Sequence, residues 1–153
     1  MKNILIKSEF EQTVQRIKNL QATNKNLWGK MTVNEMLCHV SDPLRDILGL
    51  RNTVPVTPEE MRPQIISMVM VEDEWQHNLP TFPPYLQGED GGGTKPTDFE
   101  SDKKTLLELL NSFFNTTNDF QFHPHAGLGI LSREQFGQFI WKHTDHHLRE
   151  FGA

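Results

Sequence analysis

The sequence KHTDHHLRE at residues 142–150 closes a strongly amphipathic run near the end of the chain. Its His143 and His147 are four residues apart, so on a helix they lie one turn apart on the same face. Earlier positions of this face, including Phe139 and Ile140, are apolar, which predicts that both imidazoles point inward. Buried imidazoles need polar partners, and a metal ion bound by both rings would satisfy them. The stretch therefore predicts a core-facing helix that carries two metal ligands.

A third ligand has to come from another segment, and His39 is the best candidate. It follows Met36 by three residues and precedes Val40, so it lies on the apolar stripe of a second predicted helix. A lone histidine at such a position is more often a hydrogen-bonded core residue. Together with His143 and His147, it would complete a three-histidine site that leaves coordination positions open for water or substrate.

Two neighbours of the histidine pair allow alternative interpretations. His146 could be a surface residue, a group behind the ligands, or the actual partner of His143; the four-residue spacing favours His147. Glu150 shares the face of the pair, because it follows its members by seven and three residues. It could orient a ligand imidazole or act as a catalytic proton acceptor, and it could equally be an ordinary carboxylate at a helix end.

Helix signals dominate the rest of the chain. Capping-box patterns begin at Ser8, Thr32 and Ser132. With the apolar periodicity, they predict four main helices at residues 8–21, 33–49, 98–116 and 132–151. Pro43 predicts a kink or an irregular turn within the second helix. A shorter helix is expected at 58–70, and the Pro- and Gly-rich segment 80–97, which contains Gly91-Gly92-Gly93, is expected to be a long flexible loop.

These elements predict an all-α fold. We expect a single domain, residues 1–153, built as a four-helix bundle with a long crossover loop and an extra short helix. The length suits one hydrophobic core and is too short for two ordinary domains. No convincing set of alternating strands competes with this interpretation.

Composition narrows the class of protein. A net charge of −5 argues against nucleic acid as a partner, because binding phosphates needs a basic face. The single cysteine, Cys38, excludes an intrachain disulfide framework and is expected to be a small buried residue. No apolar run suits a signal peptide or a membrane span. We therefore expect a cytoplasmic protein that acts on a small molecule and binds neither membrane nor nucleic acid.

Several loop residues could contribute to a pocket. Trp28 is expected to be a packing anchor. His123 and His125 could line the pocket entrance, although loop histidines are usually exposed. Three aromatic residues in or near the long loop could cover the pocket: Trp75, Phe82 and Tyr85.

Two motifs resemble the DinB-like (YfiT-like) superfamily of metal-binding four-helix bundles. Residues 27–39, LWGKMTVNEMLCH, are similar to its W-x-x-M-(S/T) motif before the second helix, which ends in the first metal histidine. Residues 143–151, HTDHHLREF, are similar to its H-x-x-H-H-x-x-Q motif on the last helix. The most similar branch is an uncharacterised one that ends in H-x-D-H-H-L-R-Q-F. The resemblance extends from the first predicted helix to the C-terminus.

The resemblance implies a ligand role for His39, His143 and His147. It also implies a divalent metal such as nickel or zinc, and often a homodimer. Characterised relatives include transferases and isomerases that use a low-molecular-weight thiol, bacillithiol or mycothiol. This chain departs from the branch at Glu150, which replaces a glutamine, and at Ala126, which replaces the aromatic residue of an H-P-x-F-G motif.

Three functions follow as hypotheses. The first is a divalent-metal-dependent enzyme that activates a water or thiol at the three-histidine site, for transfer to or hydrolysis of a small molecule. The second is a non-catalytic protein that binds a metal or small ligand as a sensor or scavenger. The third is a bundle whose histidines are only structural.

Overall fold

The computed structural model describes residues 2–71 and 74–153, and in these residues the protein is all-helical, as predicted. They contain no strand and only one isolated β-bridge, between His125 and Gly129. None of the described helices is both long enough and apolar enough to cross a membrane. The elements in chain order are α1 (Lys7–Asn19), α2 (Val33–Ile47), the 3-10 turn η1 (Glu59–Met61), α3 (Arg62–Val69), the 3-10 turn η2 (Pro83–Tyr85), α4 (Phe99–Phe114) and α5 (Arg133–Glu150).

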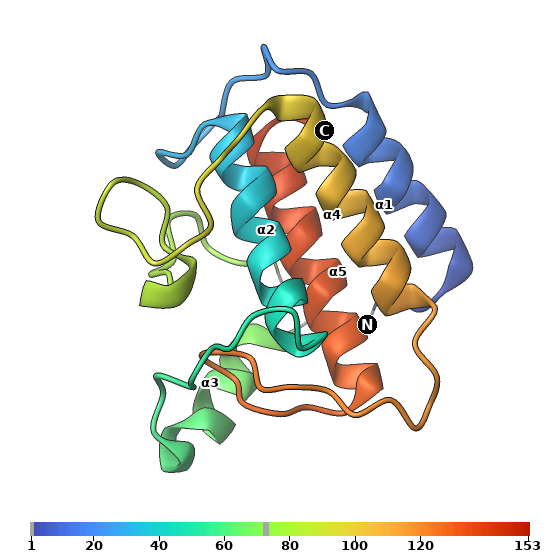
Figure 1. Ribbon diagram of the computed structural model, residues 1–153, viewed down its shortest axis with the longest axis vertical. Helices are drawn as coiled ribbons and strands as arrows, with labels where there is room; N and C mark the ends of the chain where they lie inside the picture. The colour runs from blue at the N-terminus through green and yellow to red at the C-terminus, as the bar shows by residue number, and fades with distance from the viewer. Residues whose placement is uncertain (1, 72–73) are drawn as a thin grey trace.

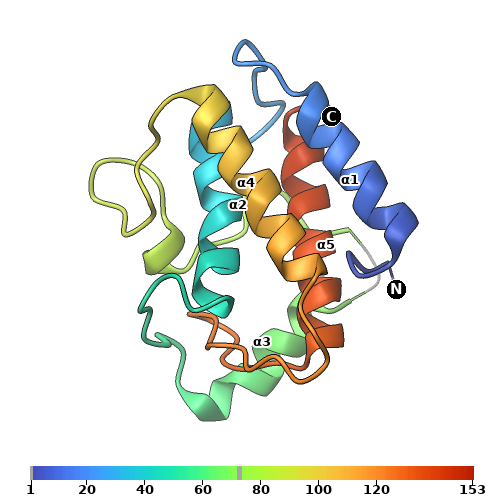
Figure 2. The same cartoon turned by 45° about the vertical axis from the view of Figure 1, so that its right-hand side comes forward.

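The four long helices α1, α2, α4 and α5 lie side by side (Figures 1 and 2). Helix α2 packs against α4 and α5, and α1 completes the ring through contacts with the same two helices. Helices α2 and α4 run in the same direction, opposite to α1 and α5, so the long segment between α2 and α4 has to return along the bundle (Figure 1). This crossover carries η1, α3 and η2.

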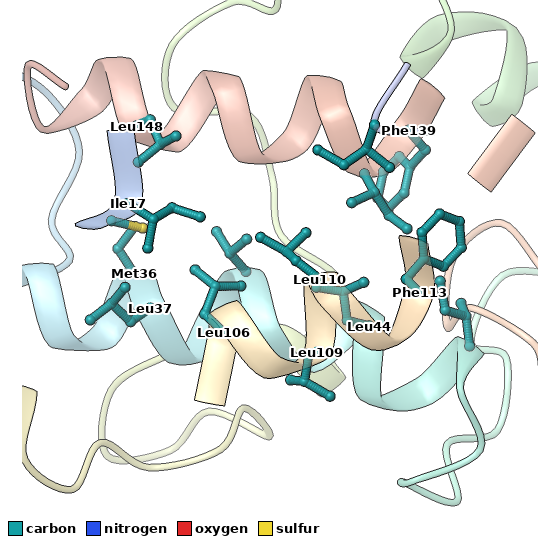
Figure 3. Close-up of a cluster of buried hydrophobic side chains, with 14 of the residues drawn as sticks. Ile17, Met36, Leu37, Leu44, Leu106, Leu109, Leu110, Phe113, Phe139 and Leu148 are labelled. Atoms are coloured by element: carbon teal, nitrogen blue, oxygen red, sulfur yellow. The ribbon is translucent and has the colours of Figure 1, made fainter. Parts of the chain in front are cut away.

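The core between these helices is apolar and closely filled. Figure 3 shows side chains of α2 and α4 meeting those of α1 and α5, with Leu106 and Leu110 between the helices. The largest buried side chains come from all four helices and include Ile17, Met36, Leu37, Leu44, Leu106, Leu110, Phe113 and Phe136. Burying them removes most of their surface from water, which is the main favourable contribution to folding. The packed helices therefore give α2 and α5 fixed positions relative to each other.

Two of the three capping boxes predicted from the sequence are present, and one is not. Thr32 and Ser132 each form the predicted capping box, with Glu35 and Gln135 as the reciprocal partners. At α1, the capping box predicted from Ser8 was wrong, because the helix already begins at Lys7. The segment before α1 is held against α5, because Ile4 is fully buried and its N–H donates to the carbonyl of Gly137 at 3.1 Å.

Prolines shape the second half of α2 and the crossover. The helix predicted at 58–70 is divided into η1 and α3, and Pro63 lies at the start of α3, where its missing N–H costs no hydrogen bond. Pro43 lies inside α2, which continues to Ile47. Pro43 has no N–H to donate to the carbonyl of His39, four residues earlier, so the ladder of α2 is interrupted beside a predicted ligand.

Buried acidic groups on α2 anchor the crossover. Asp42 is fully buried and accepts hydrogen bonds from the N–H and the hydroxyl of Thr94, at 2.7 and 2.6 Å. It also pairs with Arg45 at 2.8 Å and Arg51 at 2.9 Å. The Gly91-Gly92-Gly93 segment, predicted to be a flexible connection, is folded back by hydrogen bonds to the carbonyls of residues 83, 86 and 88. These contacts hold the crossover against α2.

Replacing Asp42 with Ala should lower the free energy of unfolding by about 3 kcal/mol, because the substitution leaves partly buried donors of Thr94 and two arginines without their shared acceptor. Chemical denaturation followed by circular dichroism measures this change. The control is Asp90→Ala in the same crossover, where the side chain is exposed and should matter by less than about 0.5 kcal/mol. Equal stability of the two variants would contradict the anchoring role of Asp42.

Candidate metal centre

The structure brings three predicted ligands together. His39 comes from the middle of α2, and His143 and His147 come from successive turns of α5. One ring nitrogen of each lies within 4.8 Å of the others, and all three side chains are buried. This arrangement follows from the packing of α2 on α5, because the stripe that faces the core carries the histidines on both helices. The cluster could hold a metal ion.

The hydrogen bonds of the ring nitrogens define which atoms face the centre. The Nδ1 of His39 lies 3.0 Å from the carbonyl oxygen of Tyr85, which can only accept, so this nitrogen carries the proton. The lone pair of His39 is therefore on Nε2. That atom lies 3.0 Å from the Nε2 of His143. Two lone pairs at this distance repel each other unless a proton or a cation lies between them.

Glu150 holds the third imidazole from behind. Its Oε2 lies 2.6 Å from the Nδ1 of His147, which leaves the Nε2 of that ring directed to the centre. Burial raises the pKa of the Glu150 carboxyl to about 7. A carboxylate that accepts the N–H of a ligand imidazole fixes its tautomer and makes it a better donor to a metal.

Burial keeps the three imidazoles neutral. It lowers the pKa of His39, and it lowers the pKa of His143 and His147 well below the usual range. The proximity of the rings adds to this, since His147 opposes protonation of His143 and His39 opposes protonation of both. Neutral imidazole is the form that binds a metal. Nitrogen ligands of this kind suit zinc, nickel, copper and iron alike, so the ligand set is compatible with several divalent metals.

The three histidines lie on the wall of a cavity of about 620 Å³ between α2, α5 and the crossover. Its lining is mainly apolar, and the ring of Phe139 stacks on His143 with 5.4 Å between centroids. Further lining residues include Trp28, Met31, Trp75, Phe82, Tyr85 and Leu128. A cavity of this size suits a small molecule, and its depth brings such a molecule to the histidines.

His146, the alternative partner of His143, lies outside the group of three. It is buried and lines the cavity, with its ring 5.6 Å from Trp75 and 5.9 Å from Trp28. Burial lowers its pKa to about 4. Trp28, expected to be a packing anchor, is half-buried at the cavity and stacks on His77 at 3.8 Å. These residues form an aromatic cluster beside the three histidines.

Loop residues contribute more to the cavity than the sequence indicated. Trp75, Phe82 and Tyr85 line it, as predicted. Of the two loop histidines, His123 is exposed and His125 is buried in the lining. The burial of the His125 side chain was not predictable, since its segment has neither helical nor strand periodicity.

Tyr85 connects the crossover to the histidine cluster. Its hydroxyl donates to Asp46 at 2.7 Å and accepts the N–H of Ala126 at 2.8 Å, while its carbonyl accepts from His39. Burial, followed by the nearby carboxylate of Asp46, raises the pKa of the Tyr85 hydroxyl, so it stays protonated. Sequence reasoning missed both Tyr85 as an orienting residue and Asp46 as its partner.

The single cysteine is not part of the site. Cys38 is buried, as predicted, and burial raises the pKa of its thiol to about 12. No serine or cysteine occurs among the described residues that line the cavity. The nucleophile of a serine or cysteine is therefore not available at the site, whose polar side chains include the imidazoles, Glu150, Glu35 and Lys30.

Comparison with known proteins gives one match. Residues 88–153 match the model of a family described as "Protein of unknown function (DUF1569)". This part contains α4, α5, His143, His147 and the loop with His125, whereas His39 lies outside it. No curated protein and no solved structure matches the chain. The family description carries no activity.

Gly29 provides a test of the contact between Glu150 and His147. A Cβ at Gly29 would overlap the Oε1 of Glu150, and its φ of +76° is unfavourable for other residues. Gly29→Ala should therefore displace the carboxylate from His147 and weaken metal binding about tenfold, measured by competition with a chelating dye.

The matched control is Gly88→Ala. Gly88 has a similar φ of +94° and also lines the cavity, but a Cβ there meets no atom within 4 Å. Both variants should lose about 1 kcal/mol of stability from backbone strain, and only Gly29→Ala should lose metal affinity. Equal metal affinities in the two variants would show that the carboxylate does not support His147.

Proposed function

We propose that this protein is a divalent-metal-dependent enzyme of the DinB-like type, which acts on a small molecule by transfer or hydrolysis. The observation that supports this most is the cluster of His39, His143 and His147 on the wall of a largely apolar cavity. A structural metal site is normally closed by four protein ligands, whereas three ligands beside a cavity leave a position for water or substrate. Nickel and zinc are the metals that we propose, and both suit imidazole ligands.

Each part of the site has a defined task in this proposal. The bound ion would lower the pKa of a water or of a small thiol, and so supply a nucleophile near neutral pH. Tyr85 fixes the orientation of His39, and Glu150 fixes that of His147. Glu150 also lines the cavity, where its carboxylate would accept the proton that the nucleophile releases. The aromatic lining excludes water and holds the apolar part of the substrate.

The thiol in this scheme has to be a separate molecule, because the only cysteine of the chain is buried away from the cavity lining. A low-molecular-weight thiol is therefore part of the proposal, and a homodimer is the oligomeric state that we propose with it. The DinB-like bundle type is supported by the four packed helices and by the positions of the three histidines on α2 and α5.

A non-catalytic binding protein is the second candidate function. It is favoured by one observation, the lack of a serine or cysteine nucleophile among the described lining residues. A sensor or scavenger needs only the metal or the cavity and no group that attacks a substrate. The two functions differ in whether the loaded protein turns over.

Metal content tests the site itself. We expect His39→Ala, His143→Ala and His147→Ala each to lose bound metal, because two neutral imidazoles hold a divalent ion much more weakly than three. Elemental analysis of protein purified without an affinity tag measures the stoichiometry. His146→Ala is the control, since this neighbouring buried histidine lies outside the group and its variant should keep the metal. Stoichiometric metal in both His143→Ala and His147→Ala would overturn the assignment.

Turnover separates the enzyme from the binding protein. Metal-loaded protein should transform simple esters, amides or electrophiles, alone or with an added thiol, and a chelator should abolish the activity. Glu150→Gln should retain metal, because its amide oxygen can still accept the N–H of His147, but should lose at least about 100-fold in turnover if the carboxylate takes the proton. A loaded protein that binds these compounds without converting any of them would favour the sensor or scavenger.

A further inference from the structure

A row of histidine rings leads from the protein surface to the three-histidine cluster. His77 is exposed in the crossover between α3 and η2, and its ring centroid lies 6.4 Å from that of His146. His146 is buried on α5 and lines the cavity, and its centroid lies 5.0 Å from that of His147. An ion bound about 2 Å from a nitrogen of one ring is therefore already close to the next ring.

His77 is held in place with its nitrogens available. Its ring stacks on Trp28 with 3.8 Å between centroids and an interplanar angle of 4°. Stacking covers a face of the imidazole, whereas a metal binds at the ring edge, through a nitrogen lone pair. No hydrogen bond or ion pair occupies these nitrogens in the described residues. Because Trp28 lines the cavity, the stack places an available imidazole at its rim.

His146 is suited to bind an ion only weakly. Of its two nitrogens only Nδ1 is closed off from solvent, so Nε2 is the one that an ion can reach. A ring that binds through Nε2 carries its proton on Nδ1, and a ligand imidazole normally donates that proton to an acceptor. His39 and His147 have such acceptors, a carbonyl and a carboxylate, whereas the Nδ1 of His146 has none in the part of the chain described. His146 can therefore hold an ion briefly without being a resident ligand.

The aromatic surroundings of His146 make such a ligand necessary for a passing ion. Trp28 and Trp75 flank His146, at 5.9 and 5.6 Å between ring centroids. A divalent ion that loses hydrating water beside apolar rings is unfavourable unless another ligand replaces the water. The imidazole between the two tryptophans provides that ligand.

The charges near His146 are balanced. Arg149, three residues after His146 on α5, pairs with Glu74 at 2.6 Å and with Asp145 at 3.1 Å. Its positive charge is therefore largely compensated where a cation would pass. Further along, the carboxylate of Glu150 lines the cavity and attracts a cation.

We propose that His77 and His146 form a loading path for the metal. The ion is bound first by the exposed imidazole at the rim, then by the buried one, and then by His39, His143 and His147. This inference rests on the metal site of the proposed function, and not on the catalysis proposed there. A group that binds the ion only in transit changes the rates of uptake and release by the same factor, so the dissociation constant stays the same.

Rapid mixing of metal-free full-length protein with zinc ions and a chelating dye measures uptake. Release is measured at a chelator concentration that no longer affects the rate. His77→Phe keeps a ring on Trp28 without ligand nitrogens, and His146→Leu fills a similar volume without them. Each should slow uptake and release about fivefold or more at an unchanged dissociation constant. The control is His123→Ala, an exposed histidine outside the cavity lining, which should load at the wild-type rate.

His77→Ala separates loading from gating. If the stack on Trp28 only closed the cavity, His77→Ala would load faster and His77→Phe would load at the wild-type rate, which would overturn the inference. Wild-type rates in either His77→Phe or His146→Leu, or a raised dissociation constant in either, would also overturn it. A wild type that binds no zinc would overturn the proposed function as well, whereas zinc binding with unchanged rates in the variants would overturn the loading path alone.

Discussion

The hydrogen bond from the Nδ1 of His39 to the carbonyl of Tyr85 is the interaction on which the site depends. It joins the middle of α2 to the crossover, and it decides which nitrogen of His39 is available at the centre. The hydroxyl of the same tyrosine reaches Asp46 and the N–H of Ala126, so one residue positions a ligand, a buried carboxylate and the loop before α5. Loss of this arrangement would leave the bundle core intact and the cavity without its wall.

Burying polar groups in an apolar cavity is unfavourable unless they are hydrogen-bonded, and three of the imidazoles that line this cavity have a defined partner at Nδ1. His39 has a carbonyl, His147 has a carboxylate, and His125 has two backbone N–H groups. These partners fix the tautomers of the rings, and burial keeps the rings neutral. The Nε2 lone pairs of His39 and His147 then face the same centre, where a bound metal would complement them.

The helices and the three candidate ligands could be predicted from the sequence, because both follow from local residue spacing. The spacing of His143 and His147 is periodic, so it shows their shared face directly, and the apolar stripe around His39 identified its inward direction. The capping residues of α2 and α5 were visible for the same reason. The sequence did not predict the orienting role of Tyr85, its partner Asp46 or the burial of His125. These features depend on loop geometry, which is set by contacts between distant segments.

The burial of Cys38 has a consequence for the chemical reactivity of the protein. With a thiol pKa of about 12, the thiolate fraction at pH 7 is on the order of 10⁻⁵. Thiolate is the species that exchanges with disulfides and attacks electrophiles, so oxidised thiols and alkylating compounds have almost nothing to modify. Cys38 is thereby protected from oxidation and alkylation, and the protein should not respond to the redox state of its surroundings through this residue.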